Sequence, residues 1–137
     1  MDSFDALGKK PRKLTAVTVP KGEAGPRLAL PALKAALDGS GPAIAPLPDG
    51  PPQLLNLIRT AIKPDDPSYP LEADDIAVVA ATSGSTGLPR GVLLTQGALY
   101  ASANAFAKRF GRDARWVLSV PAHRIAGIMV MVRAHLF

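Results

Sequence analysis

The order of apolar and polar positions divides the first part of the chain into a strand and a helix. Residues Leu14 to Val19 (LTAVTV) are rich in β-branched side chains and stop at Pro20, which predicts a short strand. Between Arg27 and Asp38 apolar side chains recur at helical spacing before Gly39, which predicts an amphipathic helix with Pro31 near its first turn. The spacing is set by Leu30, Leu33 and Leu37.

A proline-rich connection and a second helix follow. Residues 39–52 form a loop that contains a candidate short strand around Ala43 to Leu47. Residues Gln53 to Ile62 place apolar side chains on one face and stop before Pro64, which predicts a helix. The apolar residues of this face are Leu54, Leu55, Ile58 and Ile62.

An acidic connection then leads to an apolar strand. Residues 63–75 are polar and rich in carboxylates, and we interpret them as a solvated loop rather than a metal site. Residues Ile76 to Thr82 (IAVVAAT) form an apolar run without alternation, which is typical of a strand covered on both faces in a parallel sheet. The acidic residues of the loop are Asp65, Asp66, Glu72, Asp74 and Asp75.

The clearest helix signal begins after a glycine-rich segment. Residues 92–94 are a candidate short strand, and Thr95 is suited to cap a helix that begins at Gln96. Apolar side chains then fall on one helical face, and Gly111 supplies a stop. The face is formed by Leu99, Ala103, Phe106 and Phe110.

The final segments predict a buried strand and an apolar helix. Residues Trp116 to Val120 indicate a strand that ends at Pro121, and Ile125 to Phe137 indicate a helix. Because this apolar helix reaches the last residue without a cap or a polar tail, we expect the chain to be a truncated domain. Together the elements indicate the α/β class, with helices layered on a mostly parallel sheet.

Composition and charge narrow the class of protein. The chain has 137 residues, of which 47% are hydrophobic, so it fits one domain with a core rather than a disordered tail. The net charge of +5 suggests an anionic partner, but few aromatic residues accompany the basic ones, which argues against a nucleic-acid surface. We expect residues 1–13 to be a flexible basic N-terminus. The basic clusters are Lys9, Lys10, Arg12 and Lys13, and Lys108, Arg109, Arg112 and Arg115.

Other classes of site and location are excluded or disfavoured. The absence of cysteine excludes disulfides, thiolate metal sites and thiol catalysis, and no metal site is predicted. The N-terminal sequence lacks the features of a secretory signal. The longest apolar stretch, Ile125 to Val132, is far shorter than the about 20 residues of a membrane span. We therefore expect a soluble cytoplasmic protein. The sequence does not indicate whether the protein is a monomer or an oligomer.

The segment Thr82 to Gly91 (TSGSTGLPRG) has the composition of a phosphate-binding loop. Its glycines permit close approach of the main chain to a ligand, its hydroxyl groups and backbone N–H groups can converge on phosphate oxygens, and Arg90 adds a positive charge. The segment matches neither the Walker A pattern nor the dinucleotide fingerprint. On these grounds alone, a flexible Gly/Ser turn remains an alternative.

The same ten residues resemble the signature T-S-G-[ST]-T-G-x-P-K-G of the adenylate-forming superfamily of acyl-CoA synthetases, peptide-synthetase adenylation domains and luciferases. Nine of ten positions match, and Arg90 replaces lysine with a planar, forked cation. The resemblance implies that the loop holds the β- and γ-phosphates of ATP, used with Mg²⁺, while a carboxylate attacks the α-phosphate. A thiol, often coenzyme A, then displaces AMP. The phosphate-binding residues implied are Thr82, Ser83, Gly84, Ser85, Thr86, Gly87, Arg90 and Gly91.

A second segment, PAHRIAG from Pro121 to Gly127, resembles the family motif P-x-x-H-[IVM]-x-G, whose histidine lines the acyl pocket. Aligned on its first and last residues, the histidine position holds Arg124, and His123 lies one residue earlier. Both are therefore candidate catalytic residues. Either His123 substitutes after a local shift, or the pocket has changed, or the chain is a decayed copy.

Longer stretches resemble the o-succinylbenzoate:CoA ligases of menaquinone biosynthesis, especially their compact bacterial forms. These stretches are LALPALKAALDGSGPAIAPLP, ALYASANAFAKRFG and WVLSVPAHRIAGIMVMVRA. The resemblance implies conversion of o-succinylbenzoate to its coenzyme A thioester, with a small carboxylate, ATP and coenzyme A as partners. Another acyl-CoA ligase is the runner-up.

The later motifs of the family have no counterpart in the sequence: the acidic ribose-binding residue, the hinge, and the C-terminal domain with its catalytic lysine. We therefore expect residues 14–137 to be an incomplete N-terminal AMP-binding domain that cannot complete adenylation by itself. Two alternatives remain, a non-catalytic nucleotide-binding remnant and a basic interaction protein whose loop binds another anion.

Overall fold

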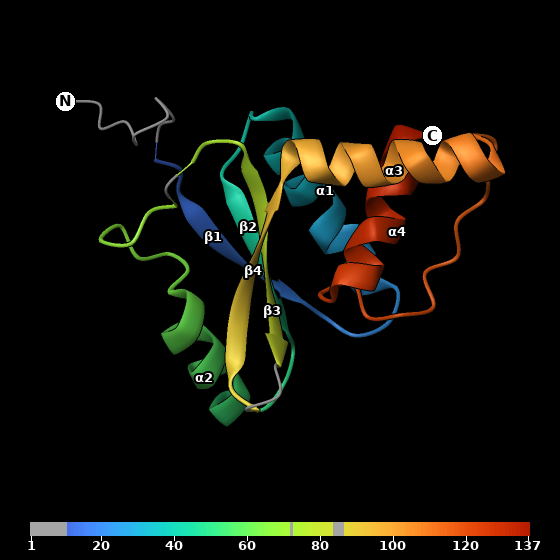
Figure 1. The fold of residues 1–137 in the computed structure, drawn as a ribbon. Helices are drawn as coiled ribbons and strands as arrows, with labels where there is room; N and C mark the ends of the chain where they lie inside the picture. Colours follow the sequence, from blue (N-terminus) through green and yellow to red (C-terminus); the bar gives the residue numbers. More distant parts are fainter. Residues whose placement is uncertain (1–10, 72, 84–86) are drawn as a thin grey trace.

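The computed structural model describes residues 11–71, 73–83 and 87–137 and has the predicted α/β architecture (Figure 1). Its four-stranded sheet has the order β1-β2-β3-β4, in which the first three strands are parallel and β4 runs antiparallel to β3. The prediction of a mostly parallel sheet is therefore confirmed. The strands are β1 (Leu14–Val19), β2 (Ala43–Pro48), β3 (Ile76–Ser83) and β4 (Pro89–Thr95), and the helices are α1 (Ala24–Asp38), α2 (Pro52–Ile62), α3 (Gln96–Phe110) and α4 (Ile125–Leu136).

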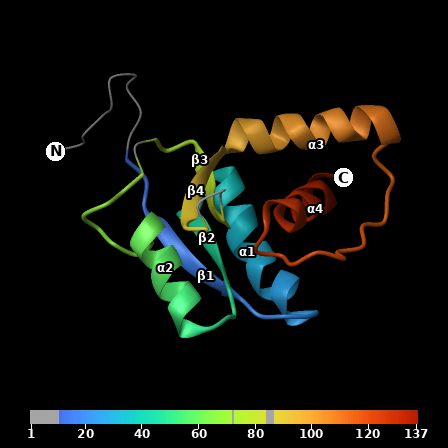
Figure 2. The same cartoon turned by 60° about the horizontal axis from the view of Figure 1, so that its bottom comes forward.

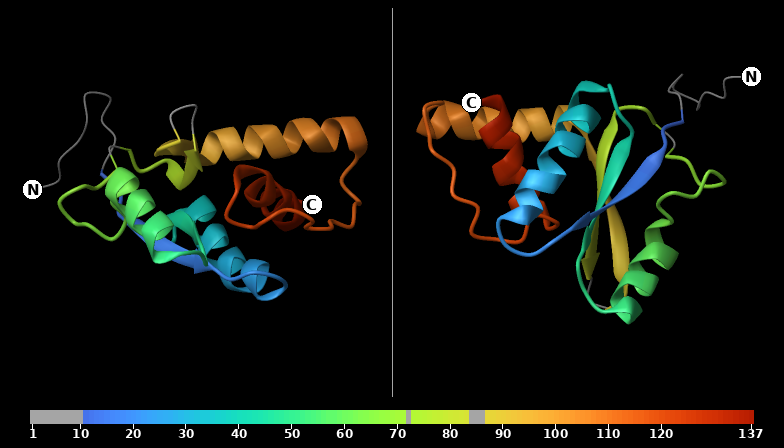
Figure 3. Two further views of the ribbon diagram at one scale, coloured as in Figure 1. Left: turned by 90° about the horizontal axis from the view of Figure 1, so that it is seen from below. Right: turned by 180° about the vertical axis from the view of Figure 1, so that it is seen from behind.

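Helices cover both faces of the sheet. Helix α2 lies on one face, while α1, α3 and α4 lie on the other (Figures 2 and 3). The larger core joins α1, α3 and α4 to the sheet through buried residues that include Leu33, Val78 and Ile128. A smaller core on the α2 face includes Leu14 and Val79. This double coverage explains why β3 is apolar without alternation.

Strand β2 forms in the middle of the sheet although it contains two prolines. It pairs with β1 along its whole length, from Leu14↔Ala43 to Val19↔Pro48, but its pairing with β3 is confined to Ile44↔Val78. Proline has no N–H group to donate to a neighbouring strand. The candidate strand predicted inside the 39–52 loop is thus confirmed and extended to Pro48.

Helix α1 begins one turn earlier than predicted and contains Pro31 in its interior rather than near its first turn. A proline there removes one helical hydrogen bond. The helix persists because its inner face is deeply buried in the core, so that tertiary packing outweighs the local cost. The fully buried residues of this face are Ala29, Leu33, Ala36 and Leu37.

Helix α3 has the predicted N-cap but a different apolar face near its end. The hydroxyl oxygen of Thr95 accepts a hydrogen bond from the backbone N–H of Ala98 at 3.1 Å. Leu99 and Ala103 are buried as expected, whereas Phe110 is 69% exposed and Ala107 is buried instead. Phe110 is the last residue of α3, and its ring packs against that of Phe106 with a centroid distance of 4.6 Å rather than against the core, so its predicted core position is wrong.

The predicted strand from Trp116 to Val120 does not form. The segment runs from α3 to α4 without pairing to any strand of the described sheet, and Val117 is 80% exposed. The ring of Trp116 packs instead against Phe106, with a centroid distance of 5.0 Å, and lies within 5.5 Å of the Arg133 guanidinium carbon. An apolar run becomes a strand only where a neighbouring edge receives its hydrogen bonds.

The side chain of Arg12 links the amino ends of the parallel strands by hydrogen bonds. Its side chain is 8% exposed, and its Nη1 and Nη2 atoms donate hydrogen bonds of 2.6–3.0 Å to four backbone carbonyl groups. Burial lowers the pKa of Arg12, and the nearby carboxylates of Asp74, Asp38 and Asp75 act in the opposite direction. The accepting carbonyl groups belong to Ala36, Gly41, Asp74 and Ile76.

This position of Arg12 differs from the flexible, basic N-terminus predicted for residues 1–13. Residues 1–10, which include Lys9 and Lys10, lie outside the described residues, and for them the prediction stands as a proposal. Arg12 itself is part of the folded domain, because the main chain also exchanges hydrogen bonds of 2.9 and 2.7 Å with Leu71.

Candidate functional site

The ten-residue signature segment occupies the turn between β3 and β4. The two strands pair up to Thr82↔Arg90 and Ser83↔Pro89, so both ends of the segment are held in the sheet rather than in a free loop. Gly84, Ser85 and Thr86 lie outside the described residues, and their predicted phosphate contacts remain predictions. The sheet therefore fixes where the turn leaves the domain.

The strand alternation divides the signature between two faces of the sheet. Thr82 follows Val78 and Ala80 at intervals of two, which places it and its partner Arg90 on the face of the larger core. Ser83 and Gly91 fall on the opposite face, toward α2. Thr82 and Arg90 are consequently the described signature residues that share a face with α4 and the segment preceding it.

Glycine is required at two positions of the signature for different structural reasons. Gly87 has φ +74°, a conformation that other residues adopt at a cost, and open space surrounds its missing side chain. At Gly91 a Cβ atom would lie 2.7 Å from Cγ2 of Ile62 and 3.1 Å from Cγ1 of Val79. Gly91 therefore permits α2 to pack on the hairpin, a role that is independent of phosphate.

The PAHRIAG segment forms a tight turn into α4. The backbone N–H of Arg124 donates to the carbonyl oxygen of Pro121 at 3.2 Å, and α4 begins at Ile125. A Cβ on Gly127 would lie 2.2 Å from that same carbonyl oxygen, so only glycine allows the turn to fold back on the helix. The spacing from Pro121 to Gly127 is thus a packing requirement that holds His123 and Arg124 at the start of α4.

A groove of about 1000 Å³ lies at the carboxyl ends of β1 and β2. Its walls are the loops that follow these strands and the segment 118–124, and both His123 and Arg124 line it. Since β1, β2 and β3 are parallel, the turn that follows β3 leaves the same edge of the sheet. In open α/β sheets this edge is where ligands bind.

Helix ends and charges give the groove a positive character. Helices α1, α2 and α4 all begin at it, and none has a side-chain hydrogen bond at its N-cap, in contrast to α3. Their amino ends contribute partial positive charge. Burial lowers the pKa of His123, and the positive charge of Arg124 lowers it further. His123 is therefore biased toward the neutral imidazole, which can accept a proton or a hydrogen bond.

The loops that follow β1 and β2 also line the groove, which the sequence pattern did not predict. Lys21 and Arg27 after β1, and Asp49 after β2, line the groove together with His123 and Arg124. The signal was present, because PKG after Val19 and DG after Pro48 each follow a strand that the apolar pattern had located. Only the parallel order of these strands brings their following loops together.

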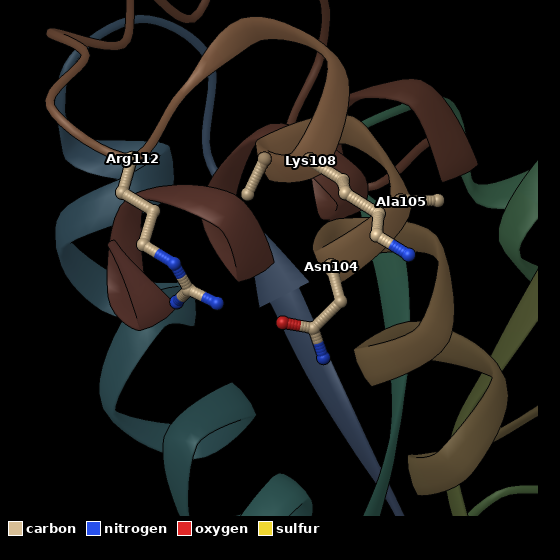
Figure 4. Close-up of a pocket in the computed structure, with 5 residues that line it drawn as sticks. Asn104, Ala105, Lys108 and Arg112 are labelled. Carbon is tan, nitrogen blue, oxygen red and sulfur yellow. The ribbon is translucent and has the colours of Figure 1, made fainter.

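A second hollow, of about 480 Å³, lies on α3 and is unrelated to the signature segments. Figure 4 shows the side chains of Asn104 and Arg112 extending toward it. Ala105 and Lys108 complete the labelled lining. It contains none of the predicted site residues, so the groove at the carboxyl edge is the better candidate.

The described residues contain no group of three or more His, Asp or Glu side chains arranged to hold a metal ion. Across residues 11–71, 73–83 and 87–137, no helix has the length and apolar character of a membrane span. The candidate site is thus a cationic groove beside a glycine-rich turn.

Comparison with protein families gives this arrangement its context. The family model described as "AMP-binding enzyme" matches residues 8–137. The chain belongs to the AMP-binding enzymes. The matched range includes the signature turn, and the resemblance stated from the ten residues is confirmed at the level of the family.

Several relatives share one name. "Probable 2-succinylbenzoate--CoA ligase" of Mycobacterium tuberculosis is 42% identical over 121 residues, which cover 88% of this chain and 29% of the relative. "2-succinylbenzoate--CoA ligase" of Staphylococcus aureus is 37% identical over 82 residues, covering 56% and 17%. That of Bacillus velezensis is 35% identical over 75 residues, covering 53% and 15%. The chain spans 29% of the length of its Mycobacterium relative.

Proposed function

We propose that this chain provides the phosphate-binding turn and part of the acyl-binding groove of an acid–thiol ligase. The proposed reaction activates a carboxylate with ATP and transfers the acyl group to coenzyme A. The proposed acid is 2-succinylbenzoate, the compound named in the ligases that the chain resembles. We place this reaction in the cytoplasm, as expected from the sequence.

The position of the signature turn is the observation that carries the proposal. The turn leaves the same edge of the parallel sheet at which His123 and Arg124 line the groove. Thr82 and Arg90 lie on the face of the sheet that α4 covers, and α4 begins directly after Arg124. A nucleotide on the turn and an acid in the groove would therefore meet on one side of the domain.

The chemistry assigns separate tasks to the turn and the groove. In the first step a carboxylate oxygen of the acid bonds to the α-phosphorus of ATP, the α–β anhydride bond breaks, and pyrophosphate leaves. In the second step the coenzyme A sulfur bonds to the acyl carbon and AMP leaves, while the thiol proton passes to solvent or a base. Arg90 would neutralise charge on the β- and γ-phosphates, and the backbone N–H groups of the turn would orient them.

Magnesium enters this scheme bound to the phosphates of ATP, as part of the substrate. Neutral His123 is suited to orient the acid by accepting a hydrogen bond or to take up a proton. We propose that His123 is the groove residue that orients the acid or takes up the proton, with Arg124 as its charged neighbour. Exchange of Arg124 for histidine tests whether the displaced histidine matters for use of the acid.

Limited proteolysis tests nucleotide binding at the turn. Arg90 is exposed and forms a tryptic cleavage site, while Arg115, exposed in the segment between α3 and α4, provides an internal control. We expect MgATP to slow cleavage after Arg90 several-fold and to leave cleavage after Arg115 unchanged. Equal slowing at both sites, or no slowing at Arg90, would contradict binding of ATP at the turn.

A turnover assay separates binding from catalysis. The ribose-binding, hinge and catalytic-lysine motifs of the family have no counterpart in these 137 residues. We therefore expect no pyrophosphate above background when the chain is mixed with MgATP and 2-succinylbenzoate, even where the proteolysis assay detects binding. Release of pyrophosphate would show that the 137-residue chain suffices for adenylation. ATP binding with no acid recognised would favour the alternative of a nucleotide-binding remnant.

A further inference from the structure

The cations of the groove come from separate elements and differ in their partners. Lys21 follows β1, Arg27 lies in the first turns of α1, and Arg124 precedes α4. Arg27 is paired with Glu23 at 3.9 Å. Neither Lys21 nor Arg124 forms an ion pair with any residue that the structure describes. These two side chains therefore retain their charge for a ligand.

The remaining lining makes the groove suitable for an organic acid rather than a free inorganic anion. Leu54, Leu118 and Val120 contribute apolar surface, and the buried Ala122 lies beside them. Asp49 and Glu23, the partner of Arg27, add carboxylates, so the cations are part of a mixed lining rather than a uniformly positive patch. An aromatic or aliphatic body would contact the apolar wall while an anionic group reached the cations.

We propose that Lys21 and Arg124 determine substrate specificity by holding the carboxylate of the acid that is not activated. This inference rests on the proposed function. The acid named in the relatives is a dicarboxylate, and adenylation consumes the charge of one carboxylate only. The other stays ionised throughout and is costly to desolvate in an apolar groove unless cations meet it. Cations contributed by two separate segments of the groove lining would select acids that carry a second carboxylate.

A matched pair of ligands isolates the contribution of the ring carboxylate to binding. 2-Succinylbenzoate and 4-oxo-4-phenylbutanoate share the ring and the keto acid chain, but the second compound lacks the ring carboxylate. Dissociation constants for both are measured on the 137-residue chain by isothermal titration calorimetry or ligand-observed NMR. We expect the dicarboxylate to bind about tenfold more tightly, an effect of the size of one charged hydrogen bond.

Three variants locate the preference. Lys21→Gln and Arg124→Gln should each lower the dicarboxylate preference about three-fold or more while affinity for the monocarboxylate changes little. Lys34→Gln, an exposed lysine of α1 outside the groove, is the matched control and should retain the full preference. Unchanged circular-dichroism melting curves verify that the variants fold. The preference should also decline as salt is raised, because the cations are solvent-accessible.

The outcomes separate this inference from the proposed function. Equal affinity for both acids, binding of neither acid, or a preference that survives both groove substitutions would overturn the role of Lys21 and Arg124. Protection of Arg90 by MgATP would stand in each of those cases. Conversely, a dicarboxylate preference that depends on both cations supports the inference even if the chain fails to bind MgATP, a result that would count against the proposed function alone.

Discussion

The two ends of the parallel sheet use their cations in opposite ways. At the amino ends of the strands, Arg12 is buried and all its hydrogen bonds go to backbone carbonyl groups. At the carboxyl ends, Arg124 is exposed and lines an open groove without an ion pair among the described residues. A cationic side chain is therefore available to a ligand only where the fold has not already supplied hydrogen-bond acceptors for it.

The same contrast explains why the net charge alone was a weak guide. A buried guanidinium group that donates four hydrogen bonds to backbone carbonyl groups stabilises the chain connections around it and has little left to offer an anion. A cation on a loop at the carboxyl edge costs little to solvate and is free to pair on binding. The +5 charge thus combines a residue that serves stability with residues that we propose to serve recognition.

The largest expected effect is at the amino end. Arg12→Ala leaves four carbonyl acceptors without their donors, and we expect the free energy of unfolding to fall by about 3–5 kcal/mol. Urea denaturation followed by circular dichroism measures this change. Lys13→Ala alters the exposed neighbour and should change stability by less than about 0.5 kcal/mol. Equal stability of the two variants would remove the distinction between buried and exposed cations.

The reciprocal test is at the signature turn. Arg90→Ala removes a cation proposed to contact phosphate, so MgATP affinity should fall by about 1.5–3 kcal/mol in binding free energy. Its free energy of unfolding should change by less than about 0.5 kcal/mol, because Arg90 is exposed. Calorimetric titration and urea denaturation of the same sample give both numbers. An Arg90→Lys variant, which restores the family's residue, should recover most of the affinity.

A substitution at Gly91 tests whether this signature residue is required for packing rather than for binding. A Cβ at this position meets Ile62, so Gly91→Ala should lower the free energy of unfolding by about 1–3 kcal/mol. In an Ile62→Ala background the clash is relieved and the added cost of Gly91→Ala should largely disappear. A double-mutant cycle in urea measures this coupling. Additive effects would show that α2 does not set the requirement for glycine.

The smallest expected effect is a change in the titration of His123. Burial is the main cause of its lowered pKa and Arg124 the second, so Arg124→Gln should raise the pKa while leaving it below the usual value. NMR titration of the imidazole protons measures this, and His135→Gln assigns the two histidine signals. No change on removal of Arg124 would show that the two side chains do not interact electrostatically.

The direction of the shift also fixes the sign of a pH effect on stability. The unfolded chain takes up the His123 proton at higher pH than the folded chain does, so the unfolded state binds more protons in that interval. The stabilisation from neutral His123 is complete above its unfolded pKa of about 6.5 and is lost as the pH falls through the lower folded value. Replacement of His123 by Gln should flatten this part of the stability profile in urea.

The elements that the sequence predicted correctly are those in which local signals and burial agree. Residues 14–19 and 76–82 are β-branched or uniformly apolar, and Thr95 has both the residue type and the position of an N-cap. The family signature likewise identified the turn, because its residues are contiguous. Local chemistry was sufficient in these cases.

The errors occurred where a partner distant in sequence decides the outcome. Residues 116–120 have a strand pattern but pair with no strand of the described sheet. Phe110 is apolar yet exposed, while the charged Arg12 is buried. Periodicity reports which side chains can be buried, and it cannot report which surface will cover them.

By itself the sequence determined the α/β class, most of the elements, the family and the position of the signature turn, since each depends on residues close together in the chain. The tertiary structure decided that Lys21, His123 and Arg124 line one groove. It also decided that Gly91 is needed for packing and that the side chain of Arg12 donates hydrogen bonds to backbone carbonyl groups. Parallel strand order gathers loops that are far apart in sequence at one edge of the sheet. That spatial arrangement, and not the identity of the residues alone, separates a structural cation from one available to a ligand.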